Sequence, residues 1–170
     1  MGHRAHRRSG PASVACAVVT VSDTRTEATD TSGAFIRKAL QRRRHRVAAY
    51  DILPDAPRRV TAHLRSLARR GGIDVVLLSG GTGIAPRDST HEAVARVLEK
   101  TLPGFGEIFR ALSYRQVGAA AMLSRAAAGT YRGLVLFSMP GSEAAVRLAM
   151  RRLILPELSH VAGLLPRARG

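Results

Sequence analysis

The sequence has little of several features that define other classes of protein. It contains one cysteine, Cys16, no tryptophan, and only 4% aromatic residues. An intrachain disulfide is therefore impossible, and few rings are available for stacking on nucleic-acid bases. The apolar runs, such as residues 14–21, are far shorter than the roughly 18 residues that cross a bilayer. We expect a cytoplasmic protein without a membrane partner, in which Cys16 is a buried, reduced thiol.

Acidic residues are also scarce, since 12 Asp and Glu stand against 27 Lys and Arg, for a formal net charge of +15. Only Lys38 and Lys100 are lysines, so a strong arginine bias explains part of this excess. The arginines cluster near both ends and within residues 37–46, 58–70 and 147–152. A polyanionic small-molecule substrate fits this charge as well as a nucleic acid does. Because the chain offers no interleaved aromatics for base stacking, we expect no nucleic-acid partner.

The length of 170 residues and the 45% hydrophobic content suit one globular domain with its own core. Residues 1–13 are rich in His, Arg, Gly and Pro without periodicity, which predicts a disordered basic arm. Residues 14–165 are expected to form the single domain. Residues 166–170 are expected to form a C-terminal tail.

Hydrophobic periodicity predicts alternating strands and helices along this domain. The expected strands are short apolar runs at about residues 14–21, 46–53, 74–78 and 133–138. Two helices are expected to begin near residue 31 and near residue 58. Four more are expected over residues 90–99, 104–116, 143–153 and 156–165. The pattern of residues 119–128 is ambiguous. This order indicates an α/β fold with a mostly parallel central sheet between two helical layers, a three-layer αβα architecture.

Polar turns follow each of the expected strands, at residues 22–23, 54–55, 79–88 and 140–142. In parallel sheets, ligands bind beyond the carboxyl ends of the strands. We therefore expect these four turns to converge on one edge of the sheet and to form the binding site there.

The turn after the third strand carries the strongest chemical signal. Gly80, Gly81, Thr82 and Gly83 let the backbone approach a ligand closely and direct N–H groups at an anion. A tight strand exit would explain the same glycines, and the lysine of a P-loop is missing. Arg87 and Asp88 follow shortly after. A guanidinium pairs bidentately with phosphate, and a carboxylate beside it can hold Mg²⁺, so this turn is a candidate phosphate site.

Asp55 is a second carboxylate at the end of a strand. Two carboxylates together with substrate phosphates are a typical Mg²⁺ environment, so Asp55 and Asp88 are candidate metal ligands. Each has a simpler alternative role, because Asp is common as a turn former and as a helix cap. The histidines offer no independent metal site, since none has Cys or carboxylate partners at ligand spacing.

Several short motifs occur in order between residues 14 and 160. They are Val19-Thr20-Val21-Ser22-Asp23, Asp30-Thr31-Ser32-Gly33, Pro54-Asp55, Ser79-Gly80-Gly81-Thr82-Gly83, Pro86-Arg87-Asp88, Pro103-Gly104-Phe105-Gly106-Glu107, Leu123-Ser124-Arg125-Ala126 and Met139-Pro140-Gly141-Ser142. Together they resemble the MoaB/MogA family of molybdenum cofactor biosynthesis proteins. The stretches at 31–33 and 103–107 look more like the MoaB branch of that family.

The resemblance implies a molybdopterin-binding fold and, in catalytic members, Mg²⁺-dependent transfer of AMP from ATP to the terminal phosphate of molybdopterin. By similarity, Asp55 and Asp88 are the catalytic and metal-binding residues, and the nucleotide phosphates meet Gly80, Gly81, Thr82, Gly83 and Arg87. The residues implied to bind molybdopterin are Ser22, Asp23, Ser124, Arg125, Pro140, Gly141 and Ser142. Glu107 is expected to brace the site.

Some members of the family are thought to bind molybdopterin without transferring AMP. A non-catalytic molybdopterin-binding or scaffold protein of the same fold is therefore the alternative, although this chain keeps Asp55 and Asp88. The resemblance also implies a homo-oligomer, either a trimer or a hexamer.

Overall fold

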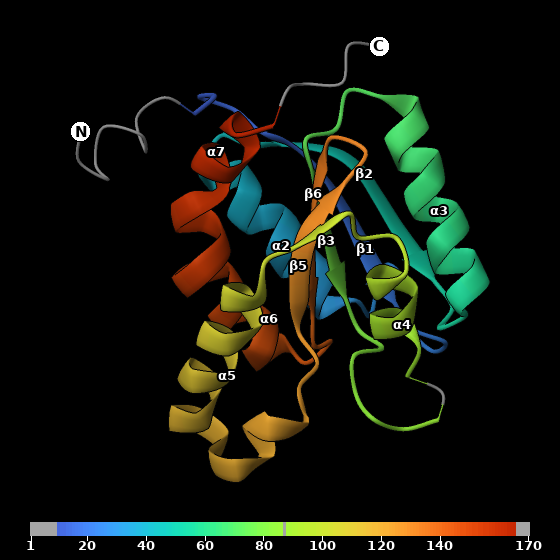
Figure 1. Ribbon diagram of the computed structural model, residues 1–170, viewed down its shortest axis with the longest axis vertical. Helices are drawn as coiled ribbons and strands as arrows, with labels where there is room; N and C mark the ends of the chain where they lie inside the picture. Colours follow the sequence, from blue (N-terminus) through green and yellow to red (C-terminus); the bar gives the residue numbers. More distant parts are fainter. Residues whose placement is uncertain (1–9, 87, 166–170) are drawn as a thin grey trace.

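The structure is a computed structural model that describes residues 10–86 and 88–165 (Figure 1). Arg87 and most of the expected terminal arm and tail, residues 1–9 and 166–170, lie outside the described residues. Within the expected arm, Gly10 is described and packs closely against helix α7 (Leu155–Gly163), because a Cβ added to Gly10 would lie 2.2 Å from the Ser159 carbonyl oxygen.

A mixed six-stranded sheet forms the centre of the domain, in the order β2-β1-β3-β6-β5-β4. Four strands run parallel, namely β1 (Ala15–Val21), β2 (Arg46–Leu53), β3 (Val75–Ser79) and β6 (Leu134–Met139). At one edge, β5 (Ala127–Tyr131) and β4 (Lys100–Thr101) pair antiparallel. The predicted mostly parallel sheet is confirmed, and the two antiparallel strands are an addition that the sequence patterns did not predict.

Helices cover both faces of the sheet, as Figure 1 shows. On one face lie α3 (Pro57–Arg70) and α4 (Thr90–Ala95), which contribute Val60, Leu64 and Val94 to one half of the core. The other face carries α2 (Thr31–Arg42), α5 (Pro103–Val117), α6 (Glu143–Ala149) and α7. The predicted three-layer αβα architecture is therefore confirmed.

Buried apolar strands hold these layers together. Every residue of β1, β3 and β6 is buried, as expected for strands covered on both faces. Cys16 is fully buried in β1, and this burial raises the pKa of its thiol to about 12. The expectation that Cys16 is buried is confirmed. No helix among the described residues is long and apolar enough to cross a membrane.

Two local predictions need correction. The helix expected over residues 90–99 ends at Ala95, because the chain turns there to reach β4. The ambiguous stretch 119–128 contains a 3-10 helix, η2 (Gly118–Leu123), and the beginning of β5. The last predicted helices are nearly continuous, since a π-helical turn, η3 (Met150–Ile154), joins α6 to α7.

Candidate functional site

One cavity of about 520 Å³ lies at the carboxyl ends of β1, β3 and β6. Its wall includes Ser22 after β1, residues 79–83 after β3, and residues 140–142 after β6. The turn after β2 joins this group indirectly, because the amide of Asp55 donates to Asp23 Oδ1 at 3.0 Å. The prediction that the four turns converge on one edge of the sheet is confirmed. A volume of this size is typical of small-molecule sites.

The glycines of the turn after β3 are required by its geometry. Gly80 has φ of +109°, and a Cβ there would lie 2.1 Å from the Val21 carbonyl oxygen. Gly81 has φ of +60°, and a Cβ there would lie 2.2 Å from Thr90 Oγ1 and 2.4 Å from Asp55 Oδ2. Both positions therefore exclude other residues by strain and by space. The backbone of the turn is left open toward the cavity.

Asp55 lies behind this turn rather than in the cavity wall. Its Oδ1 accepts hydrogen bonds from the Ser89 amide at 3.1 Å and from Ser89 Oγ at 2.7 Å, while its Oδ2 faces Gly81. The neighbouring hydroxyl of Thr90 is fully buried and has no hydrogen-bond partner among the described residues. A metal ion or a hydrogen-bonding group beside Gly81 would give a partner to both the Thr90 hydroxyl and Asp55 Oδ2.

Asp88 lines the cavity on the same side. Its Oδ2 accepts a hydrogen bond from the Ala85 amide at 3.0 Å and lies beside Gly83, where a Cβ would be 2.4 Å away. The described residues contain no group of three or more His, Cys, Asp or Glu that could hold a metal ion by itself. Asp55 and Asp88, on the two sides of the turn after β3, are nevertheless oxygen donors that suit Mg²⁺, which keeps waters and takes substrate phosphates as further ligands.

Arg125 braces the turn after β3, residues 80–83, which we call the glycine turn, from outside the cavity. Its guanidinium donates to the carbonyl oxygens of Thr82 at 3.3 Å, of Gly83, and of Asp88 at 3.0 Å, and it forms an ion pair with Glu92. The hydrogen bond from Arg125 lowers the pKa of Glu92. These contacts fix the positions of Gly83 and Asp88 relative to α4.

The structure places most of the predicted site residues around the one cavity. Those in its wall are Ser22, Gly80, Gly81, Thr82, Gly83, Asp88, Ser124, Pro140, Gly141 and Ser142. Asp23, Asp55 and Arg125 lie next to the wall but do not form part of it, and Arg87 is outside the described residues. Glu107 lines a separate hollow beside Arg110, which Ser124 and Arg125 also border.

Arg25 is a cavity residue that the sequence motifs did not single out. Its guanidinium donates to Asp30 Oδ1 and to the Gly141 carbonyl oxygen, each at 3.4 Å. Among the described lining residues, Arg25 and Asp88 carry the charges. Arg25 lies in the polar loop after β1, so a search for cations in every strand-following loop would have found it.

Asp30 holds Arg25 in place from beneath the cavity. It is only 1% exposed, caps α2 through the Gly33 amide, and accepts hydrogen bonds from Thr20 and Tyr50. Burial by itself would raise the pKa of Asp30, but these hydrogen bonds and the charge of Arg25 lower it. The carboxylate therefore stays ionised, and its charge fixes the guanidinium at the cavity wall.

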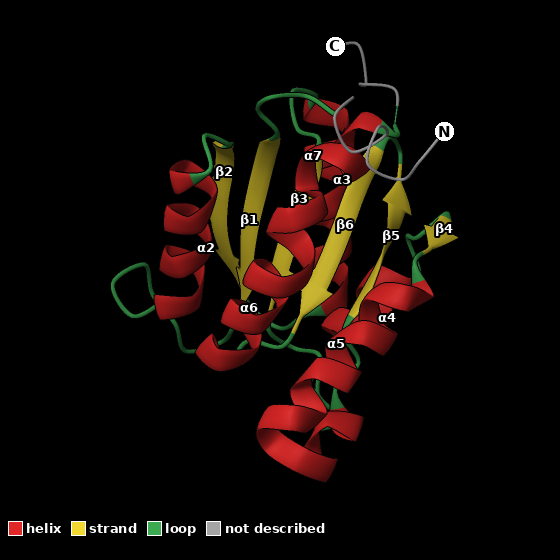
Figure 2. Cartoon of the chain, turned by 90° about the vertical axis from the view of Figure 1, so that its left-hand side faces the viewer, coloured by secondary structure: helices red, strands yellow, loops and turns green. Residues whose placement is uncertain are grey.

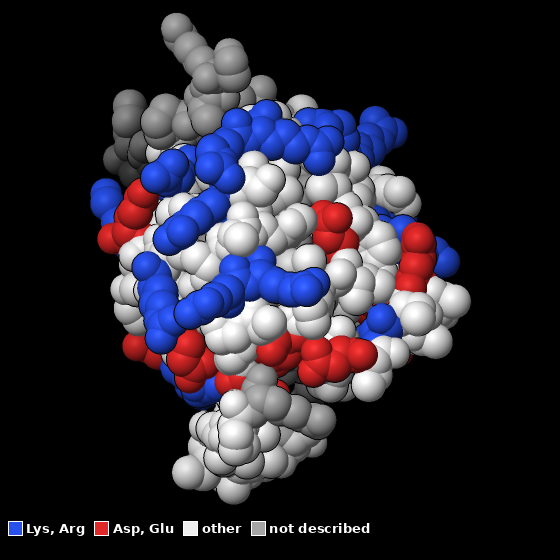
Figure 3. Space-filling model, turned by 90° about the vertical axis from the view of Figure 1, so that its right-hand side faces the viewer, with Lys and Arg blue, Asp and Glu red and all other residues white. Residues whose placement is uncertain are grey.

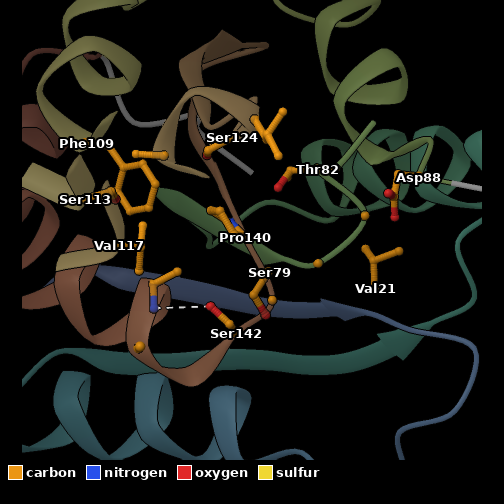
Figure 4. A pocket seen from close by; sticks show the side chains of 18 of the residues that line it. Val21, Ser79, Thr82, Asp88, Phe109, Ser113, Val117, Ser124, Pro140 and Ser142 are labelled. Carbon is orange, nitrogen blue, oxygen red and sulfur yellow. Dashed lines mark hydrogen bonds between the residues drawn. The ribbon is translucent and has the colours of Figure 1, made fainter. Parts of the chain in front are cut away.

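The opposite wall comes from α5 and is more apolar. Figure 4 shows Phe109, Ser113 and Val117 on this side, facing Thr82 and Asp88 across the opening. Phe109 is anchored by Phe105, whose ring also packs edge-on against Phe137 with centroids 5.1 Å apart. Ser142 lies below them and accepts a hydrogen bond from the Ala145 amide at 3.4 Å, which caps α6. The cavity thus joins a polar side, formed by the turn after β3 and Asp88, to an apolar side formed by α5.

Comparison with known proteins agrees with this geometry. Residues 17–160 match the model of a family described as a probable molybdopterin binding domain. The chain is 53% identical over 157 residues to the molybdenum cofactor biosynthesis protein B of Halalkalibacterium halodurans. The aligned region covers 92% of this chain and 92% of that protein.

Solved structures show the same relationship. A crystal structure of a molybdenum cofactor biosynthesis protein B is 49% identical, with a TM-score of 0.86 over 89% of this chain and 95% of that one. The tungsten cofactor synthesizing protein MoaB from Pyrococcus furiosus is 38% identical, with a TM-score of 0.81 over 91% of this chain and 98% of that one. The chain therefore belongs to the family of molybdenum cofactor biosynthesis proteins of the MoaB type.

Proposed function

We propose that this protein transfers AMP from ATP to the terminal phosphate of molybdopterin and releases pyrophosphate. The observation that carries the proposal is that one cavity joins the two groups of residues that the reaction needs. The glycine turn and Asp88 form its polar side, and Ser22, Ser124 and residues 140–142 continue the same wall. Two substrates bound along this wall would meet inside a single site.

Arg25 supports the binding of an anionic substrate. Its position is fixed by Asp30 and by the Gly141 carbonyl, so little side-chain freedom is lost when a phosphate pairs with it. The apolar wall formed by Phe109 and Val117 suits the flat ring system of a pterin. Phosphate and ring would therefore be recognised by different sides of the cavity.

In this reaction an oxygen of the molybdopterin phosphate attacks the α-phosphorus of ATP. The bond from that phosphorus to the bridging oxygen breaks, and the electron pair leaves with pyrophosphate. The protein has to align the two phosphates and stabilise the accumulating negative charge. The amides of Gly81, Thr82 and Gly83 are suited to this task because these residues line the cavity, whereas the Gly80 amide already donates to the Met139 carbonyl oxygen at 3.0 Å. Arg125 keeps the turn in shape.

Asp55 and Asp88 are the residues that would hold Mg²⁺ at this turn. The metal, when bound, neutralises phosphate charge and polarises the phosphorus–oxygen bonds. The unpartnered Thr90 hydroxyl beside Asp55 Oδ2 supports an oxygen-rich environment there. Asp88 in the cavity wall and Asp55 behind the turn would act from two sides of Gly81–Gly83.

A non-catalytic molybdopterin-binding protein remains the second candidate, and one observation favours it. Asp55 lies outside the cavity wall and uses Oδ1 for two hydrogen bonds to Ser89, which is what a purely structural carboxylate would do. Incubation of the protein with molybdopterin, ATP and Mg²⁺ separates the two functions. Pyrophosphate release that requires molybdopterin supports the transferase, whereas tight molybdopterin binding without pyrophosphate supports the alternative.

We also propose that the protein acts in the cytoplasm as a trimer or a hexamer. Large apolar side chains on α5 and η2 are exposed, including Tyr114 at 64%, Val117 at 58% and Met122 at 76%. Exposed large apolar side chains on two elements that contact each other are typical of subunit contacts. Light scattering coupled to size-exclusion chromatography measures the assembly directly, and a monomer at micromolar concentration would contradict it.

A further inference from the structure

A second hollow, far from the glycine turn in the sequence, lies between α2 and the α6–η3 segment. It has a volume of about 470 Å³ and is lined by Phe35, Lys38, Ala39, Arg42, Arg43, Arg147, Arg151 and Leu155. We name it the basic hollow. Figure 2 shows α2 and α6 next to each other on the helical layer that faces the viewer. None of the residues that line the first cavity belongs to the basic hollow.

The five cationic side chains of the basic hollow have little compensating charge. Arg147 pairs with Glu143, one turn before it, and this contact lowers the pKa of Glu143. Lys38, Arg42, Arg43 and Arg151 form no ion pair within residues 10–86 and 88–165, and no acidic residue lines the hollow. Four like charges therefore face a common space without a counter-ion from the described part of the protein.

The positions of these side chains are ordered rather than random. Lys38 and Arg42 lie one turn apart on α2, and Arg147 and Arg151 lie one turn apart on the neighbouring segment, so each pair projects from one side of its helix. Phe35 lies between the helices, with the guanidinium carbons of Arg147 and Arg151 at 4.3 Å and 5.5 Å from its ring centroid. These cation–π contacts hold two of the arginines in place.

Two simpler explanations account for only part of this arrangement. A cation in the last turn of a helix stabilises the helix dipole, which explains Arg42 and Arg147 but not Lys38. Arg151 lies in the last turn of η3, but the helix continues from there directly into α7, so its carbonyls are not a free helix end. The arginine bias of the chain explains how many arginines there are, but not why those of two different segments border one acid-free hollow.

We propose that the basic hollow is a binding site for a small oligophosphate, separate from the site of the proposed AMP transfer. Guanidinium groups pair bidentately with phosphate oxygens, and arginine is the preferred residue for such contacts. A volume of about 470 Å³ holds more than a single phosphate but is small for a folded partner. An oligophosphate supplies several negative charges within that space, whereas the carboxylates of a peptide are kept apart by its backbone.

Isothermal titration calorimetry with inorganic tripolyphosphate tests this proposal on the chain of residues 1–170. The test variant is Arg42→Gln/Arg151→Gln, which removes one cation from each side of the hollow. Its matched control is Arg69→Gln/Arg65→Gln on α3, where arginines spread over the outer face of the helix (Figure 3). The control removes the same net charge, and Arg69, like Arg42, lies in the last turn of its helix.

We expect the wild-type chain and the α3 control to bind tripolyphosphate with similar Kd at physiological salt. The test variant should raise Kd by about tenfold or more, because two charge-assisted contacts are lost. Arg25→Gln, which alters the first cavity instead, should retain binding at the basic hollow. Since no ATP or molybdopterin is present, this result does not depend on the proposed AMP transfer.

Four results would overturn the proposal. The first is absence of tripolyphosphate binding by the wild-type chain. The second is equal weakening in the test variant and in the α3 control, because the effect would then come from net charge alone. The third is binding that Arg25→Gln abolishes, since the anion would then occupy the first cavity. A single-stranded oligonucleotide that binds as tightly as tripolyphosphate through Arg42 and Arg151 would identify a nucleic-acid surface and also contradict the proposal.

Discussion

Replacement of Gly81 by alanine perturbs the point at which the glycine turn, Asp55 and Thr90 meet. Gly81 has φ of +60°, a conformation that costs a residue with a Cβ about 1–2 kcal/mol. The new methyl group would also lie 2.2 Å from Thr90 Oγ1 and 2.4 Å from Asp55 Oδ2, so both side chains must move. Displacement of two polar groups adds a similar amount, which gives a total loss of about 2–4 kcal/mol in the free energy of unfolding.

The matched control is Gly104→Ala, near the beginning of α5. A Cβ at Gly104 would meet no atom within 4 Å, and its φ is not positive. Alanine is favoured over glycine inside a helix by about 0.5–1 kcal/mol, so this control should be neutral or slightly stabilised. The two variants add the same methyl group to the same chain, and only one of them touches the site.

Thermal unfolding and pyrophosphate release are the two assays. We expect Gly81→Ala to lower the melting temperature by on the order of 10 °C, since each kcal/mol shifts Tm by about 2–4 °C in a chain of this size. Its pyrophosphate release should fall by about a hundredfold or more, because the carboxylate and the turn no longer hold the phosphates in line. Wild-type stability and turnover in Gly81→Ala, with the same protein quality as Gly104→Ala, would refute this interpretation of the turn.

Three further predictions concern groups around the core. Arg125→Gln should destabilise the fold by about 1–3 kcal/mol and raise the KM for ATP more than it lowers kcat, because the glycine turn loses the hydrogen bonds from the guanidinium. An unchanged KM in steady-state kinetics would contradict this role. Burial lowers the pKa of His45, whose Nδ1 accepts a hydrogen bond from the Val14 amide, so the free energy of unfolding should decline as the pH falls below 6.5, the ordinary pKa of histidine. His45→Gln should flatten this decline in denaturant titrations at several pH values. An equally steep decline in the variant would refute the prediction. Cys16 should resist iodoacetamide at pH 8 until the chain is unfolded, because only the thiolate reacts and burial raises the pKa of this thiol to about 12. Mass spectrometry measures the labelling, and rapid labelling of the native chain would contradict the burial of Cys16.

The sequence patterns predicted the parallel part of the sheet well, for a physical reason. Strands buried on both faces need continuous apolar runs, and β1, β3 and β6 have them. β5 reads Ala-Ala-Gly-Thr-Tyr and has no such run; it becomes a strand through its pairing with β6 and β4. The same pairing ends α4 early, because Lys100 must reach Thr130.

The site was predictable where residues follow strands and unpredictable where packing decides. Ser22, the glycine turn and residues 140–142 line the cavity because every parallel strand ends at the same edge. Helical periodicity placed α5 correctly but could not show that Ser113 and Val117 face the opening. Likewise, the family resemblance implied that Arg125 binds molybdopterin, whereas the folded chain directs this guanidinium to backbone carbonyls.

The most direct test of the proposed AMP transfer compares wild-type protein with Asp88→Asn in the presence of molybdopterin, ATP and Mg²⁺. The side-chain amide of this variant retains an oxygen that can accept from the Ala85 amide, so the turn should keep its shape while the charge is lost. The matched control is Asp51→Asn on β2, which removes the same charge from a carboxylate that lies 3.2 Å from His63 Nε2. We predict that the wild type and the control release pyrophosphate when molybdopterin is present. Asp88→Asn should lose this release while its affinity for molybdopterin is retained. Release at the wild-type rate by Asp88→Asn would contradict the role assigned to this carboxylate.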